Sequence, residues 1–181
     1  MPPFPAVVVF ALSGCWRDQV PLFDDTGTSS PCSPTRIAEL GCVVDGDTLD
    51  LATCGGERVR LLGVDTPEVH GVEEPECYGP EASSYLKDLL PEGTQLTLRF
   101  DVDCTDTYDR TLAYVYMDDP DAPDTGGGDE LFVNELILSL GYGRWFAEDI
   151  GGAQDIREKD RLLAAEDDAR SAGRGLWGAC E

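Results

Sequence analysis

Basic side chains are scarce in this sequence. The 181 residues include 13 Lys and Arg against 36 Asp and Glu, which gives a formal net charge of -23. A protein that holds phosphate groups mainly through Lys and Arg is expected to be basic, so this composition argues against tight, processive binding of a polyanion. A bound divalent cation could supply positive charge locally. An excess of surface carboxylates also favours solubility in salty surroundings, where long-range repulsion is screened.

Several other features are absent or rare. The apolar run near the N-terminus is far too short to span a bilayer as a stable helix. There is no Cys-x-x-Cys pair, and His70 is the only histidine, so we do not expect a zinc site. The length suits one domain with a hydrophobic core and is short for two. A hydrophobic fraction of 41% excludes a wholly disordered chain.

The N-terminus is typical of an export signal. Residues 1–14 carry no charged side chain, include an apolar stretch and end in Leu-Ser-Gly before Cys15. This ending resembles the lipobox of bacterial lipoproteins, in which the cysteine is lipidated and becomes the new N-terminus. We therefore expect a lipoprotein-type signal peptide and an exported protein, either secreted or anchored at the bacterial cell envelope by lipid on Cys15. The alternative is a chance match at a buried strand end, and the usual Lys/Arg residues are missing before the apolar stretch.

The remaining cysteines are even in number, which in an exported protein indicates disulfides. Residues 15–35 are rich in Asp, Thr, Ser and Pro, and we interpret them as a tether in front of the domain. Six cysteines allow many pairings, and the sequence does not choose among them. We expect one bridge across the first predicted hairpin, one between the middle two segments and one joining the two ends of the domain. The expected pairs are Cys42–Cys54, Cys77–Cys104 and Cys32–Cys180.

Alternating apolar and polar residues predict strands, and turn signals such as Asp-Gly-Asp at 45–47 separate them. Pro80 suits the first turn of a helix, and two later helical runs end at Gly141 and Gly173. The order of elements fits an α+β protein, an OB-fold five-stranded β-barrel with three packed α-helices, over residues 36–181. The expected strands are 37–44, 48–53, 57–64, 94–100 and 111–117, and the expected helices are 80–90, 133–140 and 154–172.

Residues 118–130 form an acidic stretch, which we interpret as a loop inserted after the fifth strand. Carboxylates are suitable ligands for a weak structural calcium ion. The simpler alternative is a solvated acidic loop, because no known calcium-loop spacing is present.

Residues that suit phosphate chemistry gather in three segments. Asp47 begins one predicted strand and Asp65 ends the next, and adjacent antiparallel strands bring such positions to one end of a sheet. Two carboxylates brought close repel each other unless a cation lies between them, and calcium or magnesium prefers oxygen ligands. Glu68 follows closely, and Arg60 and Arg110 occur beside these acids. Arginine makes bidentate contacts with phosphate. These are the parts for phosphodiester hydrolysis: a metal, a base for water and donors for developing charge.

Four ordered motifs then make a specific resemblance. They are Asp-Gly-Asp-Thr at 45–48, Arg-Leu-Leu-x-Val-Asp-Thr-Pro-Glu at 60–68, Tyr-Gly-Pro-Glu-Ala-Ser at 78–83 and Asp-x-Tyr-x-Arg-x-Leu-Ala-Tyr at 106–114. With Val-Asn-Glu at 133–135 and a closing Gly-Leu-Trp, the chain from Cys42 to Trp177 resembles the staphylococcal nuclease (thermonuclease) family. The resemblance implies an OB-fold barrel and a Ca²⁺-dependent endonuclease. It would hydrolyse DNA and RNA by water attack, with the 5′ oxygen leaving, to give 3′-phosphate products.

The resemblance also implies the ligands of the metal and the residue that acts on water. The carboxylates of Asp47 and Asp65 and the backbone carbonyl of Thr66 would bind Ca²⁺. Glu68 would orient or deprotonate the attacking water.

Three further residues would contact the substrate. Arg60 would contact the phosphate and stabilise the charged transition state. Arg110 would do the same and help the leaving oxygen, and Tyr108 would donate a hydrogen bond to a neighbouring phosphate.

The sequence departs from the family pattern near this last segment. Thr107 stands where the family has lysine, and Asp109 where it has glycine. The family's pair of nucleotide-binding tyrosines has no clear match. Tyr142 and Trp145, with Phe146 beside them, lie near that region and could stack on a base, because aromatic faces do so without sequence preference. We expect weaker substrate binding than in basic relatives, with intact chemistry.

Two alternatives to a nuclease remain. One is a catalytically silent OB-fold binding module, which the strong negative charge would suit if its partner were a cationic protein. The other is a calcium-stabilised surface lipoprotein, which would need the acidic loop but not the arginines. Retention of Arg60, Glu68 and Arg110 favours the enzyme. We expect DNA and RNA as partners, contact with the membrane through the lipid anchor only, and no oligomer.

Overall fold

The computed structural model describes residues 32, 35–120, 130–146 and 156–180. The expected signal peptide, Cys15 and most of the tether lie outside the described residues. So does most of the acidic stretch 118–130. Within the described ranges, no helix is both long enough and apolar enough to cross a membrane.

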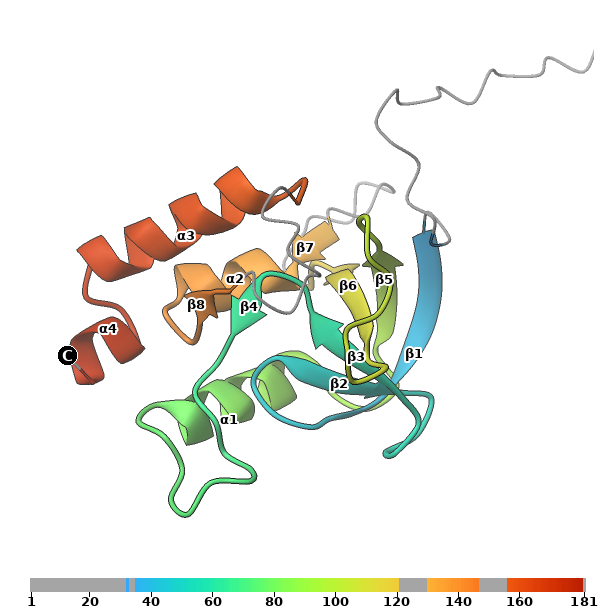
Figure 1. Ribbon diagram of the computed structural model, residues 1–181, viewed down its shortest axis with the longest axis horizontal. Helices are drawn as coiled ribbons and strands as arrows, with labels where there is room; N and C mark the ends of the chain where they lie inside the picture. The colour runs from blue at the N-terminus through green and yellow to red at the C-terminus, as the bar shows by residue number, and fades with distance from the viewer. Residues whose placement is uncertain (1–31, 33–34, 121–129, 147–155, 181) are drawn as a thin grey trace, which may run out of the picture.

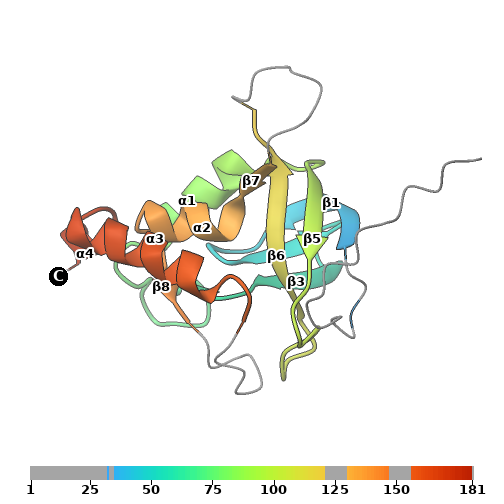
Figure 2. The ribbon, with the colours of Figure 1, turned by 90° about the horizontal axis from the view of Figure 1, so that it is seen from above.

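Five strands close into a barrel, as the sequence predicted (Figures 1 and 2). Neighbouring strands pair in the order β3-β2-β1-β5-β6, and a parallel pairing between β3 and β6 closes the ring. A short strand, β7, pairs antiparallel with the last residues of β6. The barrel strands are β1 (Thr35–Val43), β2 (Thr48–Leu51), β3 (Glu57–Leu61), β5 (Gln95–Arg99) and β6 (Thr111–Asp118), with β7 at Glu130–Phe132.

The core of the barrel is formed by side chains that point inward from alternate positions along the strands. Inward-facing side chains such as Leu40, Leu49, Val59 and Leu98 are fully buried, and Leu112 is 1% exposed. On β5, buried leucines alternate with less buried polar residues, the pattern of a strand with one face on the core. The interior is therefore filled with apolar side chains, aromatic as well as aliphatic.

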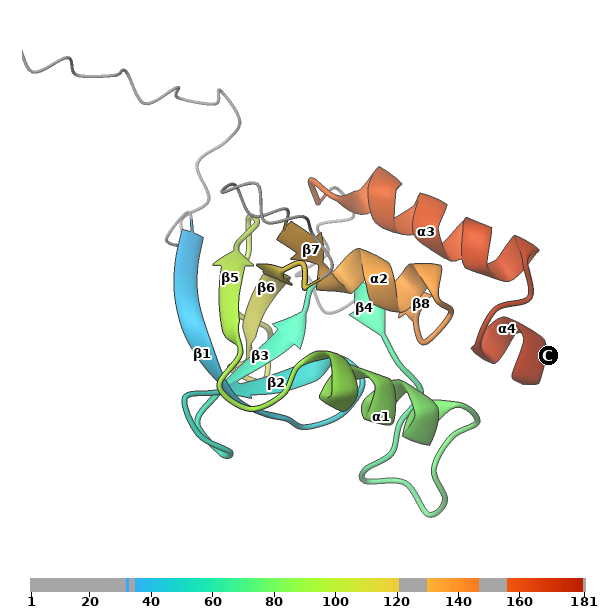
Figure 3. The same cartoon turned by 180° about the vertical axis from the view of Figure 1, so that it is seen from behind.

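The helices cover one side of the barrel (Figures 1 and 3). α2 and α3 pack on each other, and α2 also contacts β6. Asn134 fixes α2 to the barrel: its side-chain oxygen accepts the Val115 N–H at 2.9 Å, and its amide nitrogen donates to the Leu62 carbonyl at 2.9 Å. The helices are α1 (Gly79–Leu89), α2 (Val133–Ser139), α3 (Lys159–Ser171) and the short α4 (Leu176–Ala179).

Three details differ from the sequence prediction. The predicted third helix, 154–172, begins at Lys159, and residues 154 and 155 lie outside the described residues. Ile156 is buried in the core and the Arg157 N–H donates to Asp101 at 2.9 Å, so the described residues before Lys159 form a turn. Two short strands, β4 (Val64–Asp65) and β8 (Arg144–Trp145), pair outside the barrel, and α4 adds a final turn.

Three disulfides link the described cysteines, and the expected pairing is right for one of them. Cys42–Cys54 crosses the first hairpin with 5.3 Å between Cα atoms. The predicted pairs Cys77–Cys104 and Cys32–Cys180 are wrong. Antiparallel pairing of β1 with β5 brings residue 32 beside the segment that follows β5, and α4 returns residue 180 to the start of α1. The observed pairs are Cys32–Cys104, with 5.6 Å between Cα atoms, and Cys77–Cys180, with 6.0 Å.

Candidate active site

Arg60 lies at the centre of the candidate site and bridges two acids. It stands opposite Thr48 in the β2–β3 ladder, so its side chain lies beside the turn that carries Asp47. Its guanidinium forms an ion pair with Asp47 and donates to Asp65 Oδ1 at 2.7 Å. Arg60 is 6% exposed and Asp47 is 2% exposed, whereas the Asp65 side chain is 42% exposed. One face of this acid–arginine cluster is therefore open to solvent.

The second oxygen of Asp47 holds the next loop in place. Asp47 Oδ2 accepts the backbone N–H of Thr66 at 2.7 Å and its hydroxyl at 2.9 Å. Gly46 leaves room for this contact, because a Cβ there would lie 2.5 Å from the Thr66 hydroxyl oxygen. Asp45, on the same turn, accepts the Asp47 N–H at 3.2 Å. The Asp-Gly-Asp turn thus fixes residues 65–66 against β2.

Asp106 organises the loop that carries Arg110. Its carboxylate accepts the Arg110 Nε–H at 2.5 Å, the Arg110 backbone N–H at 2.9 Å and the Tyr108 N–H at 2.8 Å. The Arg110 guanidinium lies 5.4 Å from the Tyr108 ring centre, and Tyr108 is 74% exposed. Asp109 adopts φ 59°, a left-handed conformation that favours glycine and that Asp tolerates better than most residues. The turn therefore keeps its shape without glycine and adds a carboxylate.

Glu68 follows Thr66 on the loop between β4 and α1. Partial removal from water raises the pKa of its carboxyl, and the Asp45 carboxylate raises it further. Arg60 acts in the opposite direction, while Asp65 and Glu76 add to the rise. A carboxylate with a raised pKa is a better proton acceptor than an ordinary glutamate.

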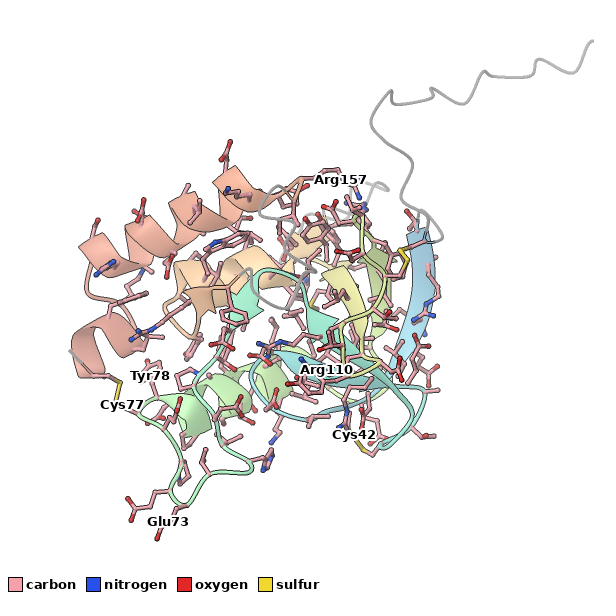
Figure 4. All side chains as sticks on the ribbon, in the orientation of Figure 1. Cys42, Glu73, Cys77, Tyr78, Arg110 and Arg157 are labelled. Carbon is pink, nitrogen blue, oxygen red and sulfur yellow. A yellow bond between two sulfur atoms is a disulfide. The ribbon has the colours of Figure 1, made fainter. Side chains whose placement is uncertain are left out.

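One open pocket, of about 370 Å³, gathers the predicted catalytic residues. The three predicted catalytic residues, Arg60, Glu68 and Arg110, all line it. Figure 4 shows Arg110 beside the strands of the barrel. The pocket is lined by Arg60, Asp65, Glu68, Tyr108, Arg110 and Phe146.

The structure does not bring Tyr142 and Trp145 into this pocket. The Tyr142 ring stacks on Tyr85 of α1, with 4.3 Å between ring centres. Trp145 packs over Gly63, where a Cβ would lie 2.7 Å from its ring. The next residue, Phe146, is the aromatic side chain that lines the pocket. Phe146 directly follows β8, which ends at Trp145, so the two neighbouring aromatic side chains have different surroundings.

The donor set fits a hard cation. Asp47 and Asp65 flank a single guanidinium, and Asp45 and Glu68 lie close enough to act on each other electrostatically. This group carries more negative than positive charge, and carboxylate oxygens are the ligands that Ca²⁺ prefers. Across the described ranges, no three His, Cys, Asp or Glu side chains converge as a ready ligand set. Backbone oxygens and water would have to complete the shell.

Fold and site together define an OB-type barrel with an acidic pocket that contains two arginines, groups that pair with phosphate. A family model described as staphylococcal nuclease homologue matches residues 58–179. The chain belongs to this family.

Curated relatives agree with this assignment. A thermonuclease of Staphylococcus hyicus is 31% identical over 137 residues, 75% of this chain and 72% of that protein. A thermonuclease of Staphylococcus intermedius is 44% identical over 104 residues, 56% of this chain and 55% of that protein. Endonuclease YhcR of Bacillus subtilis is 28% identical over 144 residues, 75% of this chain and 11% of that protein. The chain therefore spans only about half of the second relative and a small part of the third.

Sequence reasoning missed the residues that support the site. Asp106 and Glu76 were not singled out, although Asp106 precedes Arg110 by four residues and now proves to anchor it. Glu76 lies in the run Glu-Glu-Pro-Glu at 73–76, in which nothing distinguishes it from its neighbours. Its contact with Glu68 depends on how the loop closes.

Proposed function

We propose that this protein is a Ca²⁺-dependent phosphodiesterase that cuts DNA and RNA strands at internal phosphodiester bonds. The observation that carries the proposal is the pocket in which Arg60, Arg110 and Glu68 meet beside an exposed tyrosine. Membership of the nuclease family supports the same activity. Low affinity for the substrate is expected, because the net charge of -23 repels a polyanion.

Ca²⁺ would be held by the carboxylates of Asp47 and Asp65 and by the backbone carbonyl of Thr66. When bound, it would supply positive charge next to the phosphate and so replace part of what the few Lys and Arg residues do not provide. Arg60, which bridges the two carboxylates, keeps them near each other without any ion.

The chain's own residues perform the remaining steps. Glu68 accepts a hydrogen bond from the attacking water, orients it and takes up its proton, and its raised pKa suits that task. Arg60 and Arg110 donate hydrogen bonds to the phosphate oxygens, on which negative charge grows as the water attacks. As the water oxygen bonds to phosphorus, the bond from phosphorus to the 5′ oxygen breaks, the 5′ oxygen takes up a proton from solvent, and the phosphate stays on the 3′ side.

Substrate is held on either side of the scissile phosphate. Tyr108, exposed and next to Arg110, can donate its hydroxyl hydrogen to a neighbouring phosphate. Phe146 offers an aromatic face within the pocket on which a base can stack. Neither contact involves the 2′ position of the sugar, at which DNA and RNA differ, and this supports a nuclease that accepts both.

We also propose that the domain is exported and anchored by lipid on Cys15. The support is the Leu-Ser-Gly-Cys ending of the apolar N-terminal stretch and the three disulfides of the domain, which persist in oxidising surroundings. Metabolic labelling with a fatty acid would label the wild type and leave Cys15→Ala unlabelled. Labelling of both, or of neither, would contradict the anchor.

The activity is tested with single-stranded DNA and RNA oligonucleotides, with Ca²⁺ and with chelator. We expect cleavage that requires Ca²⁺, leaves 3′-phosphate ends and disappears in Arg60→Gly. A folded protein that cleaves neither substrate under any condition would contradict the proposal and favour the silent binding module.

A further inference from the structure

The loop that carries Glu68 is closed at its base by two reciprocal hydrogen bonds. The Glu76 N–H donates to the Glu68 carbonyl at 2.9 Å, and the Glu68 N–H donates to a carboxylate oxygen of Glu76 at 3.1 Å. The start of α1 also lies against this segment. A Cβ at Gly79 would lie 2.8 Å from the Pro67 carbonyl oxygen and 3.0 Å from that of Glu68. The backbone of Glu68 is therefore held by the residues that begin α1.

The start of α1 is in turn fixed to the C-terminal end of the chain. The disulfide Cys77–Cys180 joins it to α4. Tyr78, the next residue, packs against a small buried cluster that includes Leu176 and Trp177. Figure 4 shows Cys77 and Tyr78 beside the end of α4, while Glu73 lies at the far tip of the loop. Two layers of contacts thus lead from the C-terminal helix to Glu68.

We infer that Glu76 and the disulfide Cys77–Cys180 are positioning residues for Glu68. Glu68 is exposed and lies on a long loop, so its carboxylate would sample many positions unless the backbone were fixed. Proton transfer requires the base within hydrogen-bond reach of the water, and a displacement of about 1 Å can cost on the order of a hundredfold in rate. Glu76 fixes the amide and carbonyl of Glu68, and the disulfide fixes Glu76. This inference rests on the proposed function, because it concerns the base of that reaction.

The hydrogen bond from Glu68 to Glu76 is tested with three variants in the Ca²⁺-loaded protein and a single-stranded DNA oligonucleotide. Glu76→Ala removes the acceptor, and we expect kcat to fall by about tenfold or more with KM changed by less than about twofold. Glu76→Gln keeps an acceptor oxygen and should restore most of kcat. Glu74→Ala is the matched control on the exposed part of the loop and should leave kcat unchanged. An unchanged kcat in Glu76→Ala, or Glu76→Gln as slow as Glu76→Ala, would overturn the inference.

The disulfide is tested by hydrogen exchange, which needs no activity. The double variant Cys77→Ser/Cys180→Ser is compared with Cys42→Ser/Cys54→Ser, which removes the hairpin disulfide on the other side of the molecule (Figure 4). We expect the amides of Glu68 and Glu76 to exchange about tenfold faster or more in the first variant only. Equal protection in both variants would refute the tether.

The two proposals fail in different ways. If the wild type does not cleave DNA, the proposed function fails while hydrogen exchange still decides whether the disulfide holds the loop. If the wild type cleaves but the Cys77–Cys180 variant keeps both kcat and amide protection, only the positioning role fails. Should that variant not fold by near-ultraviolet circular dichroism, the positioning role of the disulfide is withdrawn, because the bridge is then needed for folding as a whole. The Glu76 series, which leaves every disulfide in place, still decides whether Glu76 positions Glu68.

Discussion

Replacing Asp106 with asparagine changes a carboxylate that accepts three hydrogen bonds within one short loop. Two come from Arg110 and one from the Tyr108 backbone. Asp106 is 8% exposed, and the Arg110 side chain is 23% exposed. The amide of asparagine would keep one acceptor oxygen but turn a donor towards Arg110, and the ion pair between Arg110 and residue 106 would be lost. Hydrogen bonds to charged groups contribute about 1.5–3 kcal/mol each, so we expect a loss of about 2–4 kcal/mol in the free energy of unfolding.

The loss should depend on pH in a defined direction. Burial by itself would raise the pKa of Asp106, but the hydrogen bonds from the backbone and side chain of Arg110 and from Tyr108 hold that pKa below its usual range. Because the folded-state pKa is lowered, the contribution to stability is fully present above the unfolded-state value of about 4. It is lost as the pH falls through the folded-state pKa.

Urea unfolding at a series of pH values measures the loss in free energy of unfolding and its dependence on pH. Asp88→Asn, on an exposed position of α1, is the matched control. The gap between wild type and Asp106→Asn should be largest near pH 7 and should shrink in acid, while the control stays near the wild type throughout. An equal gap at pH 7 and pH 3 would refute the reasoning, because it would mean that the charge of Asp106 does not stabilise the loop.

Other perturbations have equally direct outcomes. Arg60→Lys replaces the planar guanidinium, whose two nitrogens pair with Asp47 and Asp65, by a single ammonium that cannot make bidentate contacts with phosphate, and we expect kcat to fall by about a hundredfold; steady-state kinetics on a DNA oligonucleotide would show this, and a full kcat would contradict it. Phe146→Ala removes the aromatic face in the pocket and should weaken binding by about 1–3 kcal/mol with kcat retained; an unchanged KM would exclude stacking there. Removing Cys77–Cys180, which spans 103 residues, should cost about 4–5 kcal/mol in chain entropy, against about 3 kcal/mol for the hairpin disulfide; the reverse order in denaturant unfolding would contradict the entropic account.

The strands of the barrel and the residues of the central cluster could be predicted from the sequence because their signals are local, whereas the order of the strands followed only from the family resemblance. Alternation of apolar residues marked the five strands, and its period leaves little freedom in which face is buried. The acids and arginines of the site occur in ordered motifs at the strand ends, and the strand pairing brings Asp47, Arg60 and Asp65 together. Two-residue strands such as β4 and β8 carry no such periodic signal.

The remaining features depend on contacts between distant segments. The pairing of Cys77 with Cys180 requires the path of the last helix, which the sequence does not specify. The choice of Phe146 over Trp145 as the aromatic residue of the pocket depends on where β8 pairs with β4 and ends, which a two-residue strand does not signal in the sequence. Glu76 acquires its role only when its loop closes on Glu68.

The central claim is that the pocket around Arg60, Glu68 and Arg110 hydrolyses phosphodiesters with Ca²⁺. The most direct measurement is cleavage of a single-stranded DNA oligonucleotide by the wild type and by Glu68→Ser, with Ca²⁺ and with chelator. The account predicts Ca²⁺-dependent cleavage by the wild type and its near-complete loss in Glu68→Ser, with the same circular dichroism spectrum for both proteins. Cleavage that survives in Glu68→Ser or persists in chelator, or a folded wild type that does not cleave, would contradict it.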